Sequence, residues 1–309
     1  MIAPPRTAPG LAILPPVTGD LRVRIDTALT AFLDARRNHV ERRDQAALPL
    51  LEEVRRLLDS GGKRIRPAFC YWGFRAAGGR DDGDAGAAIV RAAAALELMH
   101  TMAIVHDDLI DGAKERRGVA TTAVWFSQRA DELGARGERE GFGQAMSLLV
   151  GDLAAVFADR MLLESGFLPE ALARALAVYH PMREDMAIGQ YLGLARAGDA
   201  VGGSAGDPQI ALRVAALKGG RYTVEGPLLI GAALAAVSQP VNECLSRFGR
   251  PLGEAFQLRD DLEDGEAAAG VNRETVSGLV AEATTALDPD VLVAESIPDL
   301  RRLAEMVAM

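Results

Sequence analysis

The chain has 309 residues, of which 49% are hydrophobic and 5% aromatic, and its formal net charge is −9. Six aspartates lie in two short clusters, and no basic stripe with interleaved aromatic residues stands out, so nucleic-acid binding is disfavoured. The two cysteines, Cys70 and Cys244, are too few for a disulfide framework in a chain of this length. We expect both to be buried, unpaired residues of a cytoplasmic protein.

The N-terminal stretch MIAPPRTAPGLAILPPVTGD is rich in proline and has no continuous apolar core, so it resembles neither a signal peptide nor an anchor. We expect a flexible Pro-rich tail over residues 1–20 and a single domain over residues 21–309. No apolar run is expected to reach the length of a membrane span.

From Leu21 onward the sequence predicts helices. Apolar residues recur at spacings of three and four, as at Leu29, Phe32 and Leu33, and alternating strand patterns are nearly absent. Several of the predicted helices are apolar all round and therefore buried. The pattern predicts one large all-α bundle.

Three stretches rich in glycine and charge, 78–87, 134–143 and 198–208, predict short loops between neighbouring helices. The first of them contains three aspartates. Because they lie in a glycine-rich loop, we interpret them as a solvated turn; they are Asp81, Asp82 and Asp84.

The first acidic cluster is in IVHDDLIDGAKERRG, residues 104–118, and consists of Asp107, Asp108 and Asp111. Asp107 and Asp111 are four residues apart, so they share one face of a helix. The preceding AALELMHTMAIV is almost wholly apolar, which predicts a buried helix whose carboxylates need positive partners. Lysine or arginine side chains could neutralise them, and so could a hard divalent cation. For an isolated triplet, a charged helix end in water would be the simpler interpretation.

A second cluster, in FQLRDDLEDG, has the same Asp-Asp-x-x-Asp spacing in Asp260, Asp261 and Asp264. Gln257 lies one turn before Asp260. Two copies on two buried helices indicate facing walls of one site. Magnesium suits such a site because it takes oxygen ligands from one or two carboxylates and from substrate phosphates, and no His/Cys set argues for zinc.

Basic residues lie close to these acids in the sequence. GGKRIRP places Lys63 and Arg66 at the start of a predicted helix, where side chains and backbone N–H groups can bind an anion. Arg116 and Arg117 follow the first cluster, and His100 lies two helical turns before Asp107. Together these residues predict a pocket for two diphosphates, one held through metal and one held directly by cations.

Four motifs resemble, in order, those of the trans-isoprenyl diphosphate synthases, or polyprenyl synthetases: GGKRIRP, ELMHTMAIVHDDLID followed by RRG, KGGRYTVEGPLLIGAAL and GEAFQLRDDLED. The sequence is most similar to geranylgeranyl diphosphate synthases of the actinobacterial type. The resemblance implies an isoprenoid-synthase-type helical bundle around a deep central cavity, usually in a homodimer. It also implies the condensation of isopentenyl diphosphate with an allylic diphosphate, with a three-ion cluster of Mg²⁺, or Mn²⁺ in its place.

The resemblance also assigns roles by position. Asp107 and Asp111 would bind magnesium through the allylic diphosphate, with Asp108 nearby, and Asp260 would hold a further ion. Asp261 and Asp264 complete the second metal motif. The residues implied to bind isopentenyl diphosphate are Lys63, Arg66, His100 and Arg117. Those implied to hold the allylic diphosphate are Arg116, Lys218 and Gln257. The implied catalytic set is Asp107, Asp111, Arg116, Lys218 and Asp260.

The sequence departs from the family at two places. Lys218 is followed by Gly219, where the family usually has Thr or Ser. The stretch after Asp264, DGEAAAGVNRETVSG, is shorter than usual and lacks lysine, and the region after residue 265 is abbreviated. We hypothesise that Arg273 supplies the missing cation.

The length of the prenyl product in this family depends on the size of the side chains below the first acidic motif. Met102 and Ala103, the fifth and fourth residues before Asp107, are not aromatic, which favours a deep floor and a geranylgeranyl product. Trp125, Phe126 or a partner subunit could also close the cavity.

Three alternatives remain open. A class I terpene cyclase would need an Asn, Ser/Thr and Glu metal motif, and the nearest candidate, Asn242 and Ser246, has Arg250 in the place of Glu. A noncatalytic subunit that regulates an active partner would explain the missing lysines. A metal phosphohydrolase could use His106 and Asp107 as its His-Asp dyad, but would leave the second cluster unexplained.

Overall fold

The computed structural model describes residues 19–116, 118–197, 216–236, 238–265 and 270–308. The first helix begins at Gly19, so the last two residues of the expected tail are helical, and the rest of that tail lies outside the described residues. Arg117 and the predicted loop 198–208 also lie outside them.

The described chain is almost entirely helical, which confirms the predicted all-α class. One hairpin of two short antiparallel strands interrupts the helices. The elements are α1 (Gly19–Arg43), η1 (Gln45–Ala47), α2 (Leu48–Asp59), α3 (Ile65–Ala76), α4 (Gly83–Ile110), β1 (Glu115–Arg116), β2 (Val119–Ala120), α5 (Thr122–Gln128), α6 (Arg139–Leu163), α7 (Pro169–Ala197), η2 (Ala216–Glu225, a π-helix), α9 (Gly226–Leu234), α10 (Gln239–Asp264), α11 (Arg273–Thr285), η3 (Ala294–Ser296) and α12 (Ile297–Ala308).

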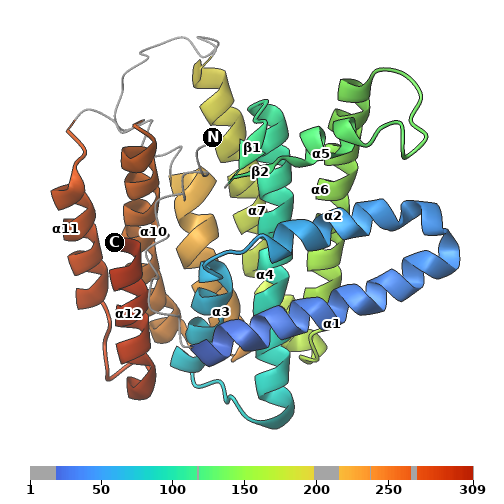
Figure 1. Ribbon diagram of the computed structural model, residues 1–309. Coiled ribbons are helices and arrows are strands. Elements are labelled where there is room, and N and C mark those ends of the chain that lie inside the picture. Colours follow the sequence, from blue (N-terminus) through green and yellow to red (C-terminus); the bar gives the residue numbers. More distant parts are fainter. Residues whose placement is uncertain (1–18, 117, 198–215, 237, 266–269, 309) are drawn as a thin grey trace, which may run out of the picture.

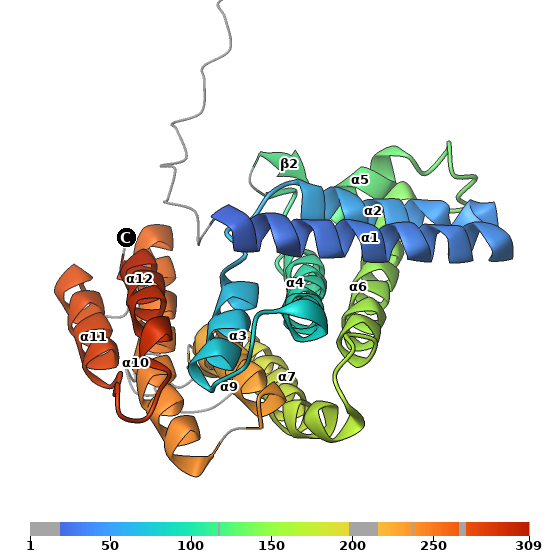
Figure 2. The same cartoon turned by 90° about the horizontal axis from the view of Figure 1, so that it is seen from below.

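The helices form a bundle with a crossing layer. α4, α6, α7 and α10 run up and down in Figure 1, whereas α1 and α2 form a helical hairpin that crosses the bundle on one side (Figures 1 and 2). α11 and α12 pack beside α10 at one edge of the molecule. The C-terminal ends of α4, α7 and α10 all lie at the upper end of the bundle in Figure 1. Both acidic clusters are therefore placed at the same end of the fold.

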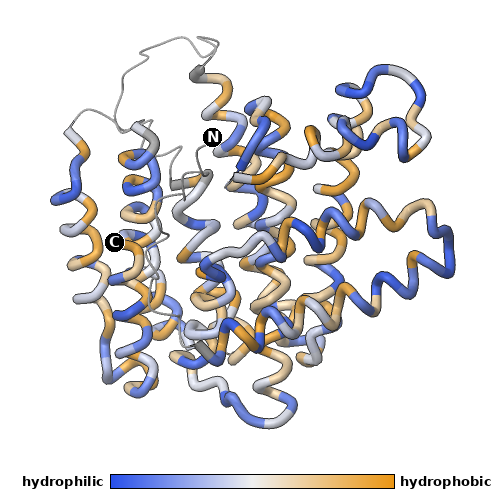
Figure 3. The backbone as a smooth tube through the Cα atoms, in the orientation of Figure 1, coloured by the Kyte–Doolittle hydropathy of each residue, from blue (hydrophilic) through white to orange (hydrophobic). Residues whose placement is uncertain are grey.

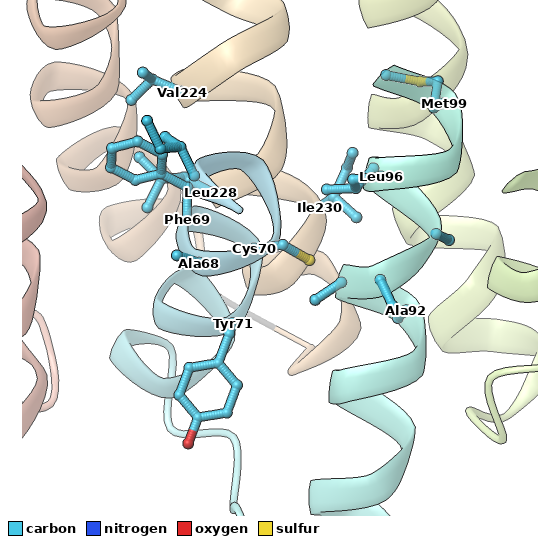
Figure 4. Close-up of a cluster of buried hydrophobic side chains, with 14 of the residues drawn as sticks. Ala68, Phe69, Cys70, Tyr71, Ala92, Leu96, Met99, Val224, Leu228 and Ile230 are labelled. Atoms are coloured by element: carbon cyan, nitrogen blue, oxygen red, sulfur yellow. The ribbon is translucent and has the colours of Figure 1, made fainter. Parts of the chain in front are cut away.

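The core is built around α3, α4 and α9. Figure 4 shows Phe69 and Cys70 of α3 near Leu228 and Ile230 of α9, with Leu96 of α4 beside them. All five are fully buried. Burying each large apolar side chain of this kind stabilises the fold by about 1.5–3 kcal/mol.

Small residues let two of these helices approach closely. A Cβ at Gly231 in α9 would lie 1.9 Å from the Cys70 carbonyl oxygen, so only glycine fits there. Cys70 and Cys244 are both buried and not disulfide bonded, as expected.

Two of the predicted loops are shorter than expected. α4 begins at Gly83, within the predicted loop 78–87, and α6 begins at Arg139, within the predicted loop 134–143. Asp84 and Glu140 of those stretches lie in the first turns of the two helices, where an acidic residue is favourable. Hydrophilic residues gather in the α1–α2 turn and in the loop before α6, both at the periphery (Figure 3).

The interpretation of Asp81 as part of a solvated turn is wrong. Its carboxylate accepts hydrogen bonds from Arg24 Nη1 at 2.8 Å and from the Tyr71 hydroxyl at 2.6 Å. The Arg24 guanidinium lowers the pKa of Asp81. Asp82 and Asp84 are exposed, in agreement with the interpretation.

The expectation that no apolar run could span a membrane is not confirmed. Within the described residues, Gly83–Ile110 is long and apolar enough, but 78% of its most apolar window is buried inside the protein. A buried core helix passes the same test, so this is only a weak indication of a span.

Candidate active site

The first acidic cluster occupies the C-terminal end of α4. The Asp108 side chain is only 6% exposed, and its Oδ1 accepts a 2.6 Å hydrogen bond from Arg116 Nε. Burial raises the pKa of Asp108, and the Arg116 guanidinium opposes this effect. Arg116 Nη2 also lies 3.6 Å from Asp107 Oδ2. Asp111 caps the helix and is exposed. The positive partner of the buried carboxylate is thus an arginine, while Asp107 and Asp111 are more accessible.

Arg116 reaches the cluster from the β1–β2 hairpin. In this hairpin Arg116 pairs with Val119, and Gly118 adopts a positive φ of 79°, a conformation that favours glycine. Arg116 therefore lies at the end of β1, and its side chain is directed back toward α4.

Gln190 of α7 is a site residue that the sequence reasoning missed. Its Nε2 donates a 2.9 Å hydrogen bond to Asp107 Oδ1. The only available signal was a polar amide within the apolar MAIGQYLGL stretch, and the two residues are 83 positions apart.

The π-helix η2 makes side-chain contacts with both α3 and α4. His100 Nδ1 lies 2.8 Å from the Tyr222 hydroxyl, and Arg66 Nη2 donates a 2.8 Å hydrogen bond to Thr223 Oγ1. The Arg66 guanidinium also lies 4.2 Å from the centroid of the Tyr222 ring, a cation–π distance. Burial raises the pKa of Tyr222, so its hydroxyl stays protonated. π-helical segments are rare and are often found at functional sites.

Lys63 and Arg66, two of the three basic residues of GGKRIRP, are not equivalent in position. Arg66 lies in the first turn of α3, whereas Lys63 is exposed in the loop before the helix, so the prediction that both lie on the helix start is only half correct. Arg64, between them, is buried and donates to Glu97 at 2.8 Å and to Asp26 at 2.8 Å. Arg64 therefore anchors the loop, which leaves Lys63 and Arg66 as the candidate anion ligands.

On its other side, η2 contacts α10 near the second cluster. A Cβ at Gly219 would lie 1.8 Å from Gln257 Oε1, so a larger residue could not enter without displacing that side chain. Gln257 Nε2 in turn donates a 2.8 Å hydrogen bond to Asp261 Oδ1. The position where the family usually has a hydroxyl is thus packed against Gln257. The Lys218 side chain lies outside the described residues.

The second cluster ends α10. Asp260, whose side chain is 38% exposed, accepts a 2.6 Å hydrogen bond from its neighbour Arg259. Arg259 is itself buried and donates through Nη1 to the Val307 carbonyl at 3.1 Å, which connects this cluster to the end of α12. The Asp264 side chain lies outside the described residues.

These donors suit a hard divalent cation. Within the described residues, no three His, Cys, Asp or Glu side chains already converge as a ligand set. A magnesium ion at Asp107 and Asp111, or at Asp260 and Asp261, would therefore take one or two carboxylates and complete its shell with water and substrate oxygens, which is its usual preference.

The floor of the expected cavity is described only in part. Met102 is buried on α4, and Phe126 is buried in α5 with its ring centroid 4.7 Å from that of Trp125. A cavity of about 710 Å³ lies between α1 and the N-terminal end of α4, lined in part by Phe32 and Met161. Of the predicted site residues that the structure describes, none lines that cavity, so the deep central cavity stays a prediction.

The residues behind two alternatives have other partners. Ser246 and Arg250, the candidates for a cyclase metal motif, both donate to Glu225 Oε1, at 2.9 Å and 2.8 Å. His106 Nε2 lies 3.5 Å from the Leu148 carbonyl oxygen of α6. These contacts disfavour a cyclase motif at Ser246 and a His-Asp dyad at His106.

The chain is similar in sequence to a known protein family. The sequence model of the Polyprenyl synthetase family matches residues 49–278. The chain belongs to this family. The assignment expected from the four motifs is therefore confirmed.

Individual polyprenyl synthetases show the same relationship. The chain is 30% identical over 211 residues to the geranylfarnesyl diphosphate synthase of Aeropyrum pernix, covering 67% of this chain and 58% of that protein. It is 32% identical over 209 residues to the geranylgeranyl diphosphate synthase of Mycobacterium tuberculosis, covering 66% and 50%. The chain thus spans little more than half the length of these relatives.

Several solved structures are similar over nearly the whole chain. One of them is the geranylgeranyl pyrophosphate synthase of Corynebacterium glutamicum, in complex with isoprenyl diphosphate and magnesium, with a TM-score of 0.83 and 27% sequence identity. The similarity covers 96% of this chain and 99% of that one.

Proposed function

We propose that this polyprenyl synthetase condenses isopentenyl diphosphate with an allylic diphosphate to give a short all-trans prenyl diphosphate. One observation carries the proposal: the π-helix η2 contacts α3, α4 and α10, so a single segment links predicted ligands of both diphosphates. His100 and Arg66 meet it at Tyr222 and Thr223, and Gln257 packs against it at Gly219.

The residues divide by the substrate that each would hold. Lys63, Arg66 and His100 would hold isopentenyl diphosphate, together with Arg117. Arg116 and Gln257 would hold the allylic diphosphate, together with Lys218. Cations fixed near the allylic leaving group stabilise the negative charge that develops as its C–O bond ionises. The double bond of isopentenyl diphosphate then attacks the carbocation, and a proton passes to the released diphosphate.

Magnesium is the cofactor of this proposal. Asp107 and Asp111, with Asp108 nearby, and Asp260, Asp261 and Asp264 would hold up to three ions, and manganese could replace them. When bound, the metal neutralises the diphosphate leaving group. The carboxylates orient the allylic substrate, and the apolar helices around them exclude water that would quench the carbocation.

A geranylgeranyl product is the most specific part of the proposal. Met102 is buried on α4, one turn below the first cluster, and it leaves more room than an aromatic side chain would. We expect Met102→Phe to shorten the product, as measured by mass spectrometry. An unchanged product would show that another residue, such as Phe126, forms the floor.

A cytoplasmic homodimer completes the proposal. α6 exposes Leu149, Val156 and Leu163, seven residues apart and therefore on one helical face. A second copy of the chain could cover this apolar stripe. We expect a dimer in light scattering and mostly monomer for Val156→Arg; an unchanged dimer would place the interface elsewhere.

The deciding experiment is a product assay. Purified protein with Mg²⁺ receives isopentenyl diphosphate and dimethylallyl, geranyl or farnesyl diphosphate, and a parallel tube receives geranylgeranyl diphosphate alone. Elongated prenyl diphosphates would establish the synthase and its chain length. Hydrocarbon from the parallel tube without elongation would indicate a cyclase, and no product in any tube would indicate a noncatalytic subunit.

A further inference from the structure

A buried carboxylate behind the β1–β2 hairpin has no role in the chemistry above. Glu53 on α2 is 0% exposed. A carboxylate in the interior is costly unless hydrogen bonds satisfy it. Glu53 Oε2 accepts from Arg56 Nε at 2.6 Å, and Oε1 accepts from Arg56 Nη2 at 2.6 Å and from Thr122 Oγ1 at 2.8 Å. Charge-assisted, two-pronged pairs of this kind fix the geometry of their partners.

The partners of Glu53 lie at the exit of the hairpin. Arg56 Nη2 also donates to the Ala120 carbonyl of β2 at 3.0 Å. Thr122 opens α5 directly after that strand. Between them, Thr121 Oγ1 donates at 2.8 Å to the Ala113 carbonyl, on the other side of the hairpin. The segment after the hairpin is thus attached to α2 and to the hairpin's own base.

This hairpin is the element that carries Arg116. Ala120 pairs with Glu115, the residue before Arg116, so the carbonyl that Arg56 binds is in the same two-residue ladder. A two-stranded hairpin is marginally stable by itself, and two residues per strand provide few hydrogen bonds. The location of the Arg116 guanidinium therefore depends on contacts that hold the hairpin from outside.

We propose that Glu53 and Arg56 are positioning residues, which hold the β1–β2 hairpin and so aim Arg116 at the diphosphate bound beside the first acidic cluster. This inference rests on the proposed function, because Arg116 is assigned there to the allylic diphosphate. Neither Glu53 nor Arg56 contacts substrate in this assignment; both act through the hairpin backbone.

The main variant is Glu53→Gln, which keeps the shape of the side chain and removes its charge. Limited trypsin digestion of the full-length protein reports hairpin opening directly, because Lys114 and Arg116 lie within or beside β1. We expect cleavage after these residues to be about tenfold faster, since charge-assisted hydrogen bonds that oppose opening are lost. Thr122→Val removes a single hydrogen bond of the same network and should act in the same direction with a smaller effect, even if Glu53→Gln folds poorly.

The second readout is the affinity for inorganic pyrophosphate with Mg²⁺, measured by calorimetry. For Glu53→Gln we expect about tenfold weaker binding and a similar rise in KM for the allylic diphosphate, with the KM for isopentenyl diphosphate unchanged. The matched control is Asp81→Asn, which breaks another carboxylate–arginine pair at the N-terminal end of α4. The control should lower stability without changing hairpin cleavage or pyrophosphate affinity.

The outcomes separate the inference from the proposed function. If Glu53→Gln and Asp81→Asn show the same cleavage, or if cleavage accelerates while pyrophosphate affinity and the allylic KM are unchanged, the positioning role is overturned. If the wild-type protein neither binds pyrophosphate nor elongates prenyl diphosphates, the proposed function fails and the aiming of Arg116 fails with it. Faster hairpin cleavage together with selective loss of the allylic substrate supports the inference.

Discussion

The two acidic helix ends have the same Asp-Asp-x-x-Asp sequence but are held in different ways. The partners of the first cluster come from other elements: Arg116 from the hairpin and Gln190 from α7. The partners of the second come largely from α10 itself, where Arg259 binds Asp260 and Gln257 binds Asp261. The exposed fractions differ as well, with Asp108 at 6% and Asp107 at 29%, against 38% for Asp260.

The difference shows that spacing alone does not determine how well a carboxylate is positioned. Tertiary packing fixes the first cluster, whereas the second relies on neighbours within one helix and on the contact between Arg259 and the end of α12. Catalytic groups work best when their orientation is fixed before the substrate binds. The first cluster should therefore contribute more to catalysis than the second.

The largest expected effect tests this ranking directly. Asp107→Asn removes a charge from the more rigid cluster, and we expect kcat to fall about 10³-fold, because stabilisation of the leaving diphosphate is lost. Asp260→Asn should reduce kcat about 10²-fold, since that side chain is less firmly placed. Steady-state kinetics across Mg²⁺ concentrations would measure both, with Asp82→Asn as an exposed control. Equal losses at the two clusters would contradict the comparison.

The next effect concerns stability. Arg116→Ala leaves Asp108 buried without its cation, and we expect the free energy of unfolding to fall by about 2 kcal/mol. This value is below that for a fully buried pair because 40% of the Arg116 side chain is exposed. Urea denaturation would measure it. Adding Asp108→Asn should recover most of the loss, and a double variant as unstable as Arg116→Ala would show that the pair does not matter.

The sequence indicated candidate site residues by their chemistry, but it did not indicate the partners that these residues have in the structure. The two clusters, Lys63, Arg66 and His100 stood out because their residue types and spacing point to diphosphate and metal. Whether side chains meet across the fold is decided by tertiary packing, which short-range periodicity does not record. Gln190, Tyr222 and Thr223 were missed for this reason.

Local structure was mispredicted where contacts with distant residues, and not the local sequence, determine it. Two-residue strands are too short to show alternation, so the β1–β2 hairpin gave no signal. Asp81 was assigned to a solvated turn because its neighbours are glycine and aspartate, but Arg24, 57 positions earlier, holds it. Gly219 was interpreted only as a missing hydroxyl, whereas the structure shows Gln257 filling the adjacent space.

A substitution at Gly219 tests the second cluster with a smaller expected effect. In Gly219→Ala the new Cβ would displace Gln257 and break its hydrogen bond to Asp261, and we expect the KM for the allylic diphosphate to rise about tenfold. Gly278→Ala in α11 is the matched control, because a Cβ there meets no atom within 4 Å. The control should be neutral or stabilise the fold by about 0.4–1 kcal/mol. Gly219→Ala with wild-type kinetics would show that Gln257 does not hold substrate.

The smallest expected effect concerns Arg273, our candidate for the cation missing after the second cluster. Arg273 is exposed in the first turn of α11, and exposed cations contribute little because water and salt screen them. We therefore expect Arg273→Ala to raise the KM for the allylic diphosphate only about threefold, with Arg273→Lys close to wild type because the charge is kept. Arg301→Ala, an exposed arginine on α12, should have no effect. If turnover and substrate affinity are unchanged in Arg273→Ala, the second cluster works without a cation from this loop. Of Arg259 and Arg273, only Arg259 would then balance the negative charge of the second cluster.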